Sequence, residues 1–343
     1  MIHRIFLSLV LMFSLPLAVN GLELNPNHPD RYIVQKGDTL WDISGKFLKH
    51  PWQWPDIWHA NPQVENPHLI YPGDELTLVW RDGQPVLELA RGLPEYRMSP
   101  QVRDITPTAA IPAISLSLIG PFLNKPHVVG EDILAQAPYV VATANQRVIA
   151  GAGDAIYARG TDAHDSEIFS VFSAGEVYTD PETGEVLGYQ AVYAGEAALT
   201  RAGDPSTLRL IKTSREVMVG DRLLVTEEDG FDLTFFPRRP ERDIDARIIS
   251  VVDGVSQIGQ YQIIVVNRGE REGFETGHVF SIYKRGETLR DTVAQEQNAM
   301  VTLPDEYAGT AMVFRVFDKV SYAIVMKATT AINIHDTLRS VDL

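Results

Sequence analysis

Hydrophobic and polar positions change their period along this chain of 343 residues, and the change marks separate folding units. Residues 31–80 begin with a short alternating run, continue with apolar positions at helical spacing, and end in a second alternating run. Leu40, Ile43 and Phe47 fall on one helical face, and Thr39 stands where the N-cap of that helix should be. The pattern therefore predicts a small βααβ module.

Two further signals lie near the end of this module. A second helix is expected to begin near Trp54, with Pro55 in its first turn. Asp82 and Gly83 stand between two alternating apolar runs, which is the pattern of a two-residue hairpin turn. An additional strand should therefore pair with the last strand of the module.

Residues 81–126 are expected to contain that additional strand and then a proline-rich linker. Prolines at this spacing prevent a continuous helix or a central strand, so the linker should be stiff and should hold the flanking parts apart. It has room for one short helix at residues 115–119. The prolines of the linker are Pro94, Pro100, Pro107, Pro112, Pro121 and Pro126.

From residue 127 to residue 343, strand-like runs alternate with turn signals, and the region contains an internal repeat. The alternative is that β-rich sequences share turn chemistry by chance. The matches pair residues 206–212 with 321–327, Val217 with Ile332, Val219 with Ile334, Asp221 with Asp336, Leu223 with Leu338, residues 151–160 with 277–286, and Gly188 with Gly309.

The expected fold class is therefore multidomain α+β. It combines the βααβ module, the proline-rich linker and an all-β lobe of two related barrel-like units, residues 127–230 and 245–343.

The N-terminal 21 residues have the pattern of a secretory signal. A short basic region precedes an apolar run of 13 residues, Ile5 to Leu17, and small residues allow cleavage after Gly21. An uncleaved membrane anchor is the alternative, although a helix that spans a bilayer needs about 20 apolar residues. We expect an exported protein with no transmembrane segment once the signal is removed.

Charge and cysteine content narrow the function further. The formal net charge of −15 argues against non-specific binding of nucleic acid and against docking on anionic lipid, and favours a neutral glycan or a protein partner. The chain has no cysteine, which excludes a lipidated N-terminus, disulfides, thiolate metal sites and thiol nucleophiles. We expect no cofactor.

Both ends of the first module resemble a LysM domain. The run Tyr32 to Ile43 is similar to the opening of that domain, and Asn61-Pro62, Asn66-Pro67 and Leu69 to Leu76 are similar to its close. The stretch Lys49 to Trp54 departs from the pattern because it lengthens the join between the helices.

The resemblance implies that the module binds glycans containing N-acetylglucosamine, as in peptidoglycan. Main-chain groups of two facing loops would bond the acetamido group, and an apolar floor would take its methyl group. Asp38 could bond the sugar or fix its own turn, and Leu40, Ile43 and Ile70 could be core alone. Trp41, Trp52, Trp54 and Trp58 could stack on sugars or pack. The site residues implied are Gly37, Asp38, Thr39, Leu40, Asn66, Pro67, His68, Leu69 and Ile70.

No pattern of a cell-wall enzyme is present, so we expect no catalytic residue, although a peptidoglycan hydrolase stays the rival class. Asp162, His164 and Asp165 form the only tight acid–histidine cluster, which is more typical of a solvated loop than of a metal site. Ser281 and Lys284 match Ser-x-x-Lys in a strand pattern, where their side chains would point to opposite faces.

The last part of the chain carries a second resemblance. Residues 254–269 and 273–279, together with the signal, module and linker, are similar to the secretin-associated proteins of type IV pili, and the lobe resembles the C-terminal domain of a flagellar H-ring protein. This implies a periplasmic, wall-associated protein of a Gram-negative bacterium that anchors an outer-membrane secretin ring to peptidoglycan. Service to another envelope machine, such as the flagellum, is the alternative.

Overall fold

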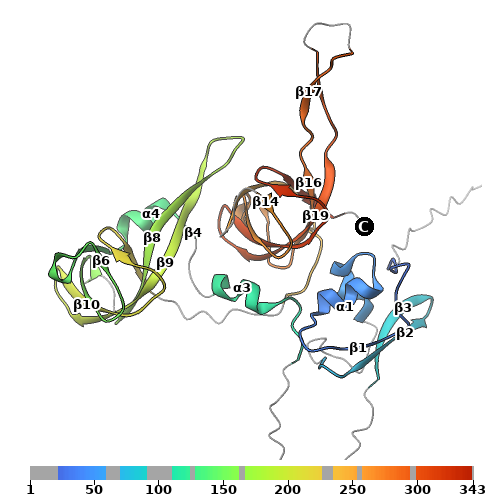
Figure 1. The fold of residues 1–343 in the computed structure, drawn as a ribbon, viewed down its shortest axis with the longest axis horizontal. Helices are drawn as coiled ribbons and strands as arrows, with labels where there is room; N and C mark the ends of the chain where they lie inside the picture. Colours follow the sequence, from blue (N-terminus) through green and yellow to red (C-terminus); the bar gives the residue numbers. More distant parts are fainter. Residues whose placement is uncertain are drawn as a thin grey trace, which may run out of the picture.

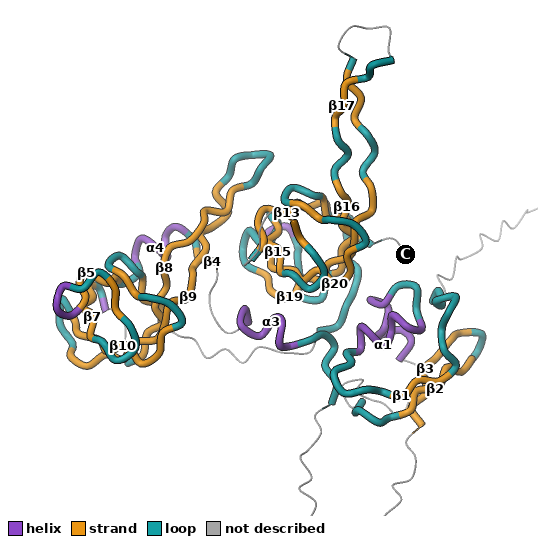
Figure 2. Tube along the Cα trace, viewed as in Figure 1, coloured by secondary structure: helices purple, strands orange, loops and turns teal. Residues whose placement is uncertain are grey.

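The computed structural model describes residues 22–58, 70–90, 110–123, 128–161, 167–225, 235–252, 257–293 and 299–341. They form a small N-terminal module and two β-barrels (Figure 1). Helices occur in the module and in a few short segments beside the barrels (Figure 2). The chain is thus predominantly β, and the α+β description holds only for the module. The predicted signal, residues 1–21, lies outside the described residues.

The N-terminal module has the predicted elements. Thr39 caps the first helix by accepting a hydrogen bond from the Asp42 N–H (3.1 Å), and Leu40, Ile43 and Phe47 are fully buried, as expected. The elements are β1 (Arg31–Ile33), α1 (Leu40–Phe47), the 3₁₀ turn η1 (Pro51–Gln53), α2 (Trp54–Trp58) and β2 (Glu75–Arg81).

The predicted hairpin is also present. Asp82 and Gly83 have φ angles of 50° and 82°, and Arg81 pairs with Gln84 across them. These positive angles are those of the turn that matches the twist of paired strands. The additional strand β3 (Gln84–Ala90) therefore extends the sheet to the order β1-β2-β3.

The two barrels share one topology. In each, six antiparallel strands close in the same order, and a two-stranded ribbon lies at one end. The first barrel consists of β5 (Tyr139–Thr143), β6 (Ile149–Ala150), β7 (Ala155–Arg159), β8 (Ile168–Thr179), β9 (Val186–Arg201), β10 (Ser206–Thr213), β11 (Val217–Met218) and β12 (Arg222–Val225). The second consists of β13 (Asp245–Val251), β14 (Gln257–Ile258), β15 (Ile263–Val266), β16 (Val279–Lys284), β19 (Glu306–Val316), β20 (Ser321–Ala328), β21 (Ile332–Asn333) and β22 (Thr337–Ser340).

Short elements flank the barrels. Strand β4 adds to the edge of β9, and the ribbon β17–β18 projects from the second barrel (Figure 1). These elements are α3 (Leu116–Leu123), β4 (Val128–Val129), α4 (Glu131–Gln136), η3 (Ala144–Gln146), η5 (Glu270–Glu272), β17 (Thr288–Arg290) and β18 (Met300–Thr302).

Strand pairing tests the repeat. The later matches are confirmed, because β10 and β20 hold equivalent places and because Asp221 and Asp336 each accept the N–H of the residue three positions earlier at 2.8 Å. The earlier matches are wrong: residues 151–160 contain β7, whose counterpart is β15, whereas residues 277–286 contain β16. Gly309 corresponds to Gly195, since both lie where a Cβ would meet a carbonyl oxygen of the neighbouring strand.

A hairpin of the first barrel contacts the second. The turn between β8 and β9 carries Glu185, whose carboxylate contacts Arg271 (2.9 Å) and Lys319 (2.7 Å), and Asp180 contacts Arg268 (2.9 Å). Tyr178, at the end of β8, is buried in the core shared with the second barrel. We call this hairpin, residues 176–187, the latch.

The expected spacer is wrong for its described part. Residues 110–123 pack between the module and the second barrel instead of holding them apart, and Ile111, Ala113, Ile114 and Ile119 are buried in one core with residues of both. The short helix expected there exists as α3 and is longer than predicted. Apolar residues between the prolines explain the difference, because their burial favours packing.

Candidate functional site

The loop before α1 is built by a tight turn. Gly37 has a φ of +99°, and the Asp38 carboxylate accepts hydrogen bonds from the Gln35 N–H and the Tyr32 hydroxyl, both at 2.8 Å. Burial of Tyr32 and its bond to Asp38 raise the pKa of that phenol to about 12. Asp38 therefore holds its own turn, which is one of the two roles that the sequence left open.

The second predicted loop is described only at its last residue. Asn66, Pro67, His68 and Leu69 lie outside the described residues, and Ile70 is fully buried. Ile70 leads through a turn at Gly73, with a φ of +98°, into β2.

A distant segment bridges these two loops. The carbonyls of Pro112 and Ala113 accept hydrogen bonds from the Leu40 N–H (3.0 Å) and the Trp41 N–H (3.2 Å), and the Ile111 N–H donates to the Ile70 carbonyl (2.8 Å). Because the first N–H groups of a helix have no partner within it, these two carbonyls complete the capping that Thr39 begins. We call residues 110–114 the strap.

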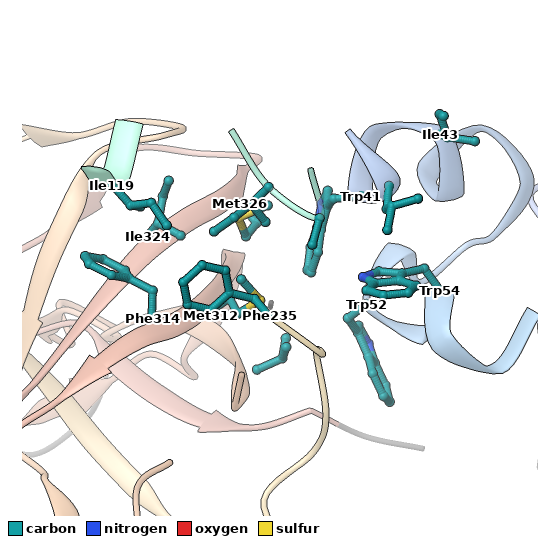
Figure 3. Packing of buried hydrophobic residues seen from close by; sticks show 14 of the residues in the cluster. Trp41, Ile43, Trp52, Trp54, Ile119, Phe235, Met312, Phe314, Ile324 and Met326 are labelled. Carbon is teal, nitrogen blue, oxygen red and sulfur yellow. The ribbon is translucent and has the colours of Figure 1, made fainter. Parts of the chain in front are cut away.

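Four of the five tryptophans of the module are packing residues, whereas Trp80 on β2 is exposed. Trp41, Trp52, Trp54 and Trp58 are at most 7 % exposed, so their faces are not available to a sugar. Figure 3 shows Trp41, Trp52 and Trp54 facing the second barrel. Residues on the barrel side of this core are Phe235, Met312, Phe314, Ile324 and Met326.

The surface of the second barrel explains this contact. Along β20, Ala323 and Val325 point into the barrel, whereas Tyr322, Ile324 and Met326 belong to the core shared with the module. In the equivalent strand β10, the outward positions are Thr207, Arg209 and Ile211, and the last two are exposed. The two barrels therefore differ in whether their outer face is covered.

Two clefts remain along this contact. One, of ≈ 260 Å³, is lined by Trp52, His50 and Lys49 of the module and by barrel residues including Tyr307 and Lys327. Burial, with the nearby Lys49 charge, lowers the pKa of His50. The other, of ≈ 240 Å³, lies beside the predicted glycan loop and is lined by Gly37, Thr39, Asp42, Ile114, Ser115, Leu118, Tyr261, Ile324 and Met326.

The described part of the chain contains no group of three histidine, cysteine or acidic side chains arranged to hold a metal ion. The cluster Asp162, His164 and Asp165 lies outside it. Ser281 and Lys284 lie on β16, as expected. No described helix combines the length and apolar character needed to cross a bilayer.

The sequence similarity of this chain to known proteins agrees with the structure of the module. Residues 32–79 match the sequence profile of the LysM domain. This part of the chain is a LysM domain. The chain is also 38 % identical over 60 residues to YqbP, an uncharacterized protein of Bacillus subtilis (strain 168). That similarity covers 15 % of this chain and 27 % of YqbP, so the chain spans about a quarter of that relative. The LysM domain suggests binding of glycans of the peptidoglycan or chitin type.

The sequence interpretation missed the strap and the covered face of β20. A usable signal existed for β20, because Tyr322 to Met326 are apolar without interruption. A barrel strand with one solvated face should alternate. The strap left only its apolar residues between prolines as a signal, and these do not indicate where it binds, because its hydrogen bonds to the module are made by main-chain groups.

Proposed function

We propose that this chain is an exported, non-catalytic protein of the bacterial cell envelope that binds peptidoglycan through its LysM domain. The match of residues 32–79 to that domain carries the proposal. The acetamido group of an amino sugar offers one carbonyl and one N–H, and the resemblance to LysM domains assigns their main-chain partners to the loops before α1 and before β2. A neutral hydrogen bond contributes about 1 kcal/mol net, so one domain should bind weakly and gain from the repeating polymer.

Sedimentation with purified peptidoglycan sacculi tests this function. The full chain should pellet with the sacculi without releasing soluble fragments. Gly37→Glu should reduce pelleting, because Gly37 lines the cleft at the predicted glycan loop and a side chain there would occupy space that the sugar needs. An added Cβ at Gly37 would meet no heavy atom within 4 Å, so the new side chain causes no clash within the domain.

Gly153→Glu is the matched control for this variant. Its φ of +90° resembles the +99° of Gly37, and it too has no atom within 4 Å of an added Cβ. It lies in a turn of the first barrel, so it carries the same backbone strain without touching the LysM domain. Failure of the unaltered chain to sediment would refute the function, and release of fragments would indicate a hydrolase.

We further propose that the barrels anchor an outer-membrane secretin ring to the wall. The β17–β18 ribbon supports this docking role, since a projecting ribbon has free edges that can pair with another β assembly. Leu289 (44 %), Met300 (61 %) and Val301 (44 %) are exposed on it, and Leu289 pairs directly with Val301, so the ribbon carries a small apolar patch of the kind found at interaction sites.

Crosslinking in intact envelopes tests this second proposal. A photoreactive group at Met300 should capture the ring protein, and the same group at Val148, which is 82 % exposed on the first barrel, is the control for non-specific capture. Capture from neither site, or equally from both, would contradict the anchoring role through this ribbon.

A further inference from the structure

The strap engages the LysM domain at the two loops to which the sequence assigns the glycan. Leu40 belongs to the first loop and Ile70 to the second, and both use their main-chain groups to bond the strap. The strap offers them peptide carbonyls and a peptide N–H, which are the same polar groups that an acetamido substituent offers. Strap and sugar therefore require the same partners.

The strap is also held by its side chains. Ile111, Ala113 and Ile114 are 4 %, 2 % and 1 % exposed. The space left beside the first loop is ≈ 240 Å³. Pockets that enclose a small ligand usually measure about 300–1,000 Å³, so a sugar ring that needs the loop amides has little room while the strap is in place.

We propose that the strap is an intramolecular competitor of the glycan, and that the LysM domain binds only after the strap leaves. This inference rests on the proposed glycan-binding function. The measured affinity then equals the affinity of the open domain multiplied by the fraction of molecules that are open. If the strap is closed in nine molecules of ten, only one molecule in ten can bind, and the measured affinity is about tenfold weaker than that of the open domain.

The competition is linked to the docking of the domain on the second barrel. The strap runs directly into α3, and Ile114 and Leu118 share a cleft with Tyr261 and Ile324 of that barrel. The Tyr261 hydroxyl also donates to the Asp42 carboxylate at 3.3 Å. Separation of barrel and domain would therefore remove support from the strap and favour glycan binding.

Calorimetric titration with a hexamer of N-acetylglucosamine tests the competition in the full chain. Ile111→Ser removes a buried side chain of the strap, and Ala113→Lys places a cation beside the N-terminus of α1, where positive charge is disfavoured. Both variants should bind the hexamer about tenfold more tightly than the unaltered chain. Leu187→Ser is the matched control, because Leu187 is also buried (5 % exposed) but lies in the latch, away from the strap. The affinity of this variant for the hexamer should equal that of the unaltered chain.

Hydrogen exchange in the unaltered chain gives an independent result should a strap variant fail to fold. Saturating hexamer should accelerate exchange at the Ile111 amide, because the Ile70 carbonyl that protects it is taken by the sugar. If the sugar bound without displacing the strap, exchange at the Ile111 amide would instead slow down or stay unchanged. Equal affinities of strap variants and unaltered chain, with unchanged exchange at Ile111, would overturn the competition but leave the function standing. Absence of binding in every variant would overturn both.

Discussion

The covered face of β20 leads to a quantitative prediction about how the LysM domain is held. Ile324 is 1 % exposed and points out of the second barrel into the core shared with the strap and α3. Its counterpart in the first barrel is Arg209, which is exposed. The repeat therefore already shows that an arginine is compatible with this barrel position when nothing covers it.

We predict that Ile324→Arg detaches the LysM domain without unfolding the second barrel. Complete burial of an isoleucine contributes about 1.5–3 kcal/mol, and a charge held in the same place adds a desolvation cost. A loss of about 3 kcal/mol lowers the docking equilibrium constant by more than a factor of 100, since 1.4 kcal/mol corresponds to a factor of ten.

Tryptophan emission is a selective assay for this change. All five tryptophans of the chain, Trp41, Trp52, Trp54, Trp58 and Trp80, lie between residues 41 and 80. Detachment should expose Trp41 and Trp52 and move the emission maximum to longer wavelength, while the far-ultraviolet circular dichroism of the barrels stays constant. Small-angle X-ray scattering should show a larger radius of gyration.

The control for this experiment is Ile211→Arg on β10. Ile211 occupies the place of Met326 in the repeat but is 53 % exposed, so its replacement should leave emission and radius unchanged. Unchanged emission and radius in Ile324→Arg, with a folded barrel, would refute the argument that this face holds the domain.

Three further predictions follow from other contacts. Thr39→Ala should destabilise the LysM domain by about 1 kcal/mol, measured by urea unfolding followed by tryptophan emission, because the Asp42 N–H loses its cap. Gly309→Ala should destabilise the second barrel by about 1–3 kcal/mol in thermal unfolding, because its Cβ would lie 2.1 Å from the Lys327 carbonyl oxygen. Gly184→Ala is the control: its Cβ would meet no atom within 4 Å, so this variant should show only the cost of a positive φ. Hydrogen bonds from Arg271 and Lys319 lower the pKa of Glu185 to about 2, so the contribution of this carboxylate to the latch is complete above pH about 4.5 and is lost as the pH falls towards 2. Scattering should therefore show a larger radius of gyration at pH 3 than at pH 7, and Glu185→Gln should reduce that difference without abolishing it, because the pKa of Asp180 in the latch is lowered as well.

Local patterns in the sequence predicted the local structure well. The Thr39 cap, the apolar face of α1 and the turn at Asp82-Gly83 each depend on residues near one another in the chain, and each is present. The similarity of β10 to β20 also identified two barrels, because the same inward positions are apolar in both.

Contacts between distant parts were not predictable in the same way. Prolines showed that residues 110–114 could not be helix or central strand, but an extended segment can be a spacer or can lie across a groove, and proline spacing does not distinguish the two. The predicted site was likewise incomplete. Main-chain groups define it, and the strap that bonds them is 41 residues further along the chain at its nearest bond, from Ile111 to Ile70.

The repeat explains why one barrel carries the domain and the other does not. Both barrels need the same inward residues to close, so selection for closure leaves the outward residues free to diverge. In the first barrel, Arg209 and Ile211 stay exposed, whereas in the second Ile324 and Met326 became one wall of a core that also includes Trp41 and the strap. The surface that holds the LysM domain is therefore the surface that keeps the strap in its groove.

A force that separates wall and barrels would then expose the glycan site as it pulls, so that attachment would strengthen under load. This predicts that Ile324→Arg, designed to detach the domain, should also bind the N-acetylglucosamine hexamer more tightly than the unaltered chain. Detachment without any gain in affinity would show that docking and strap are independent.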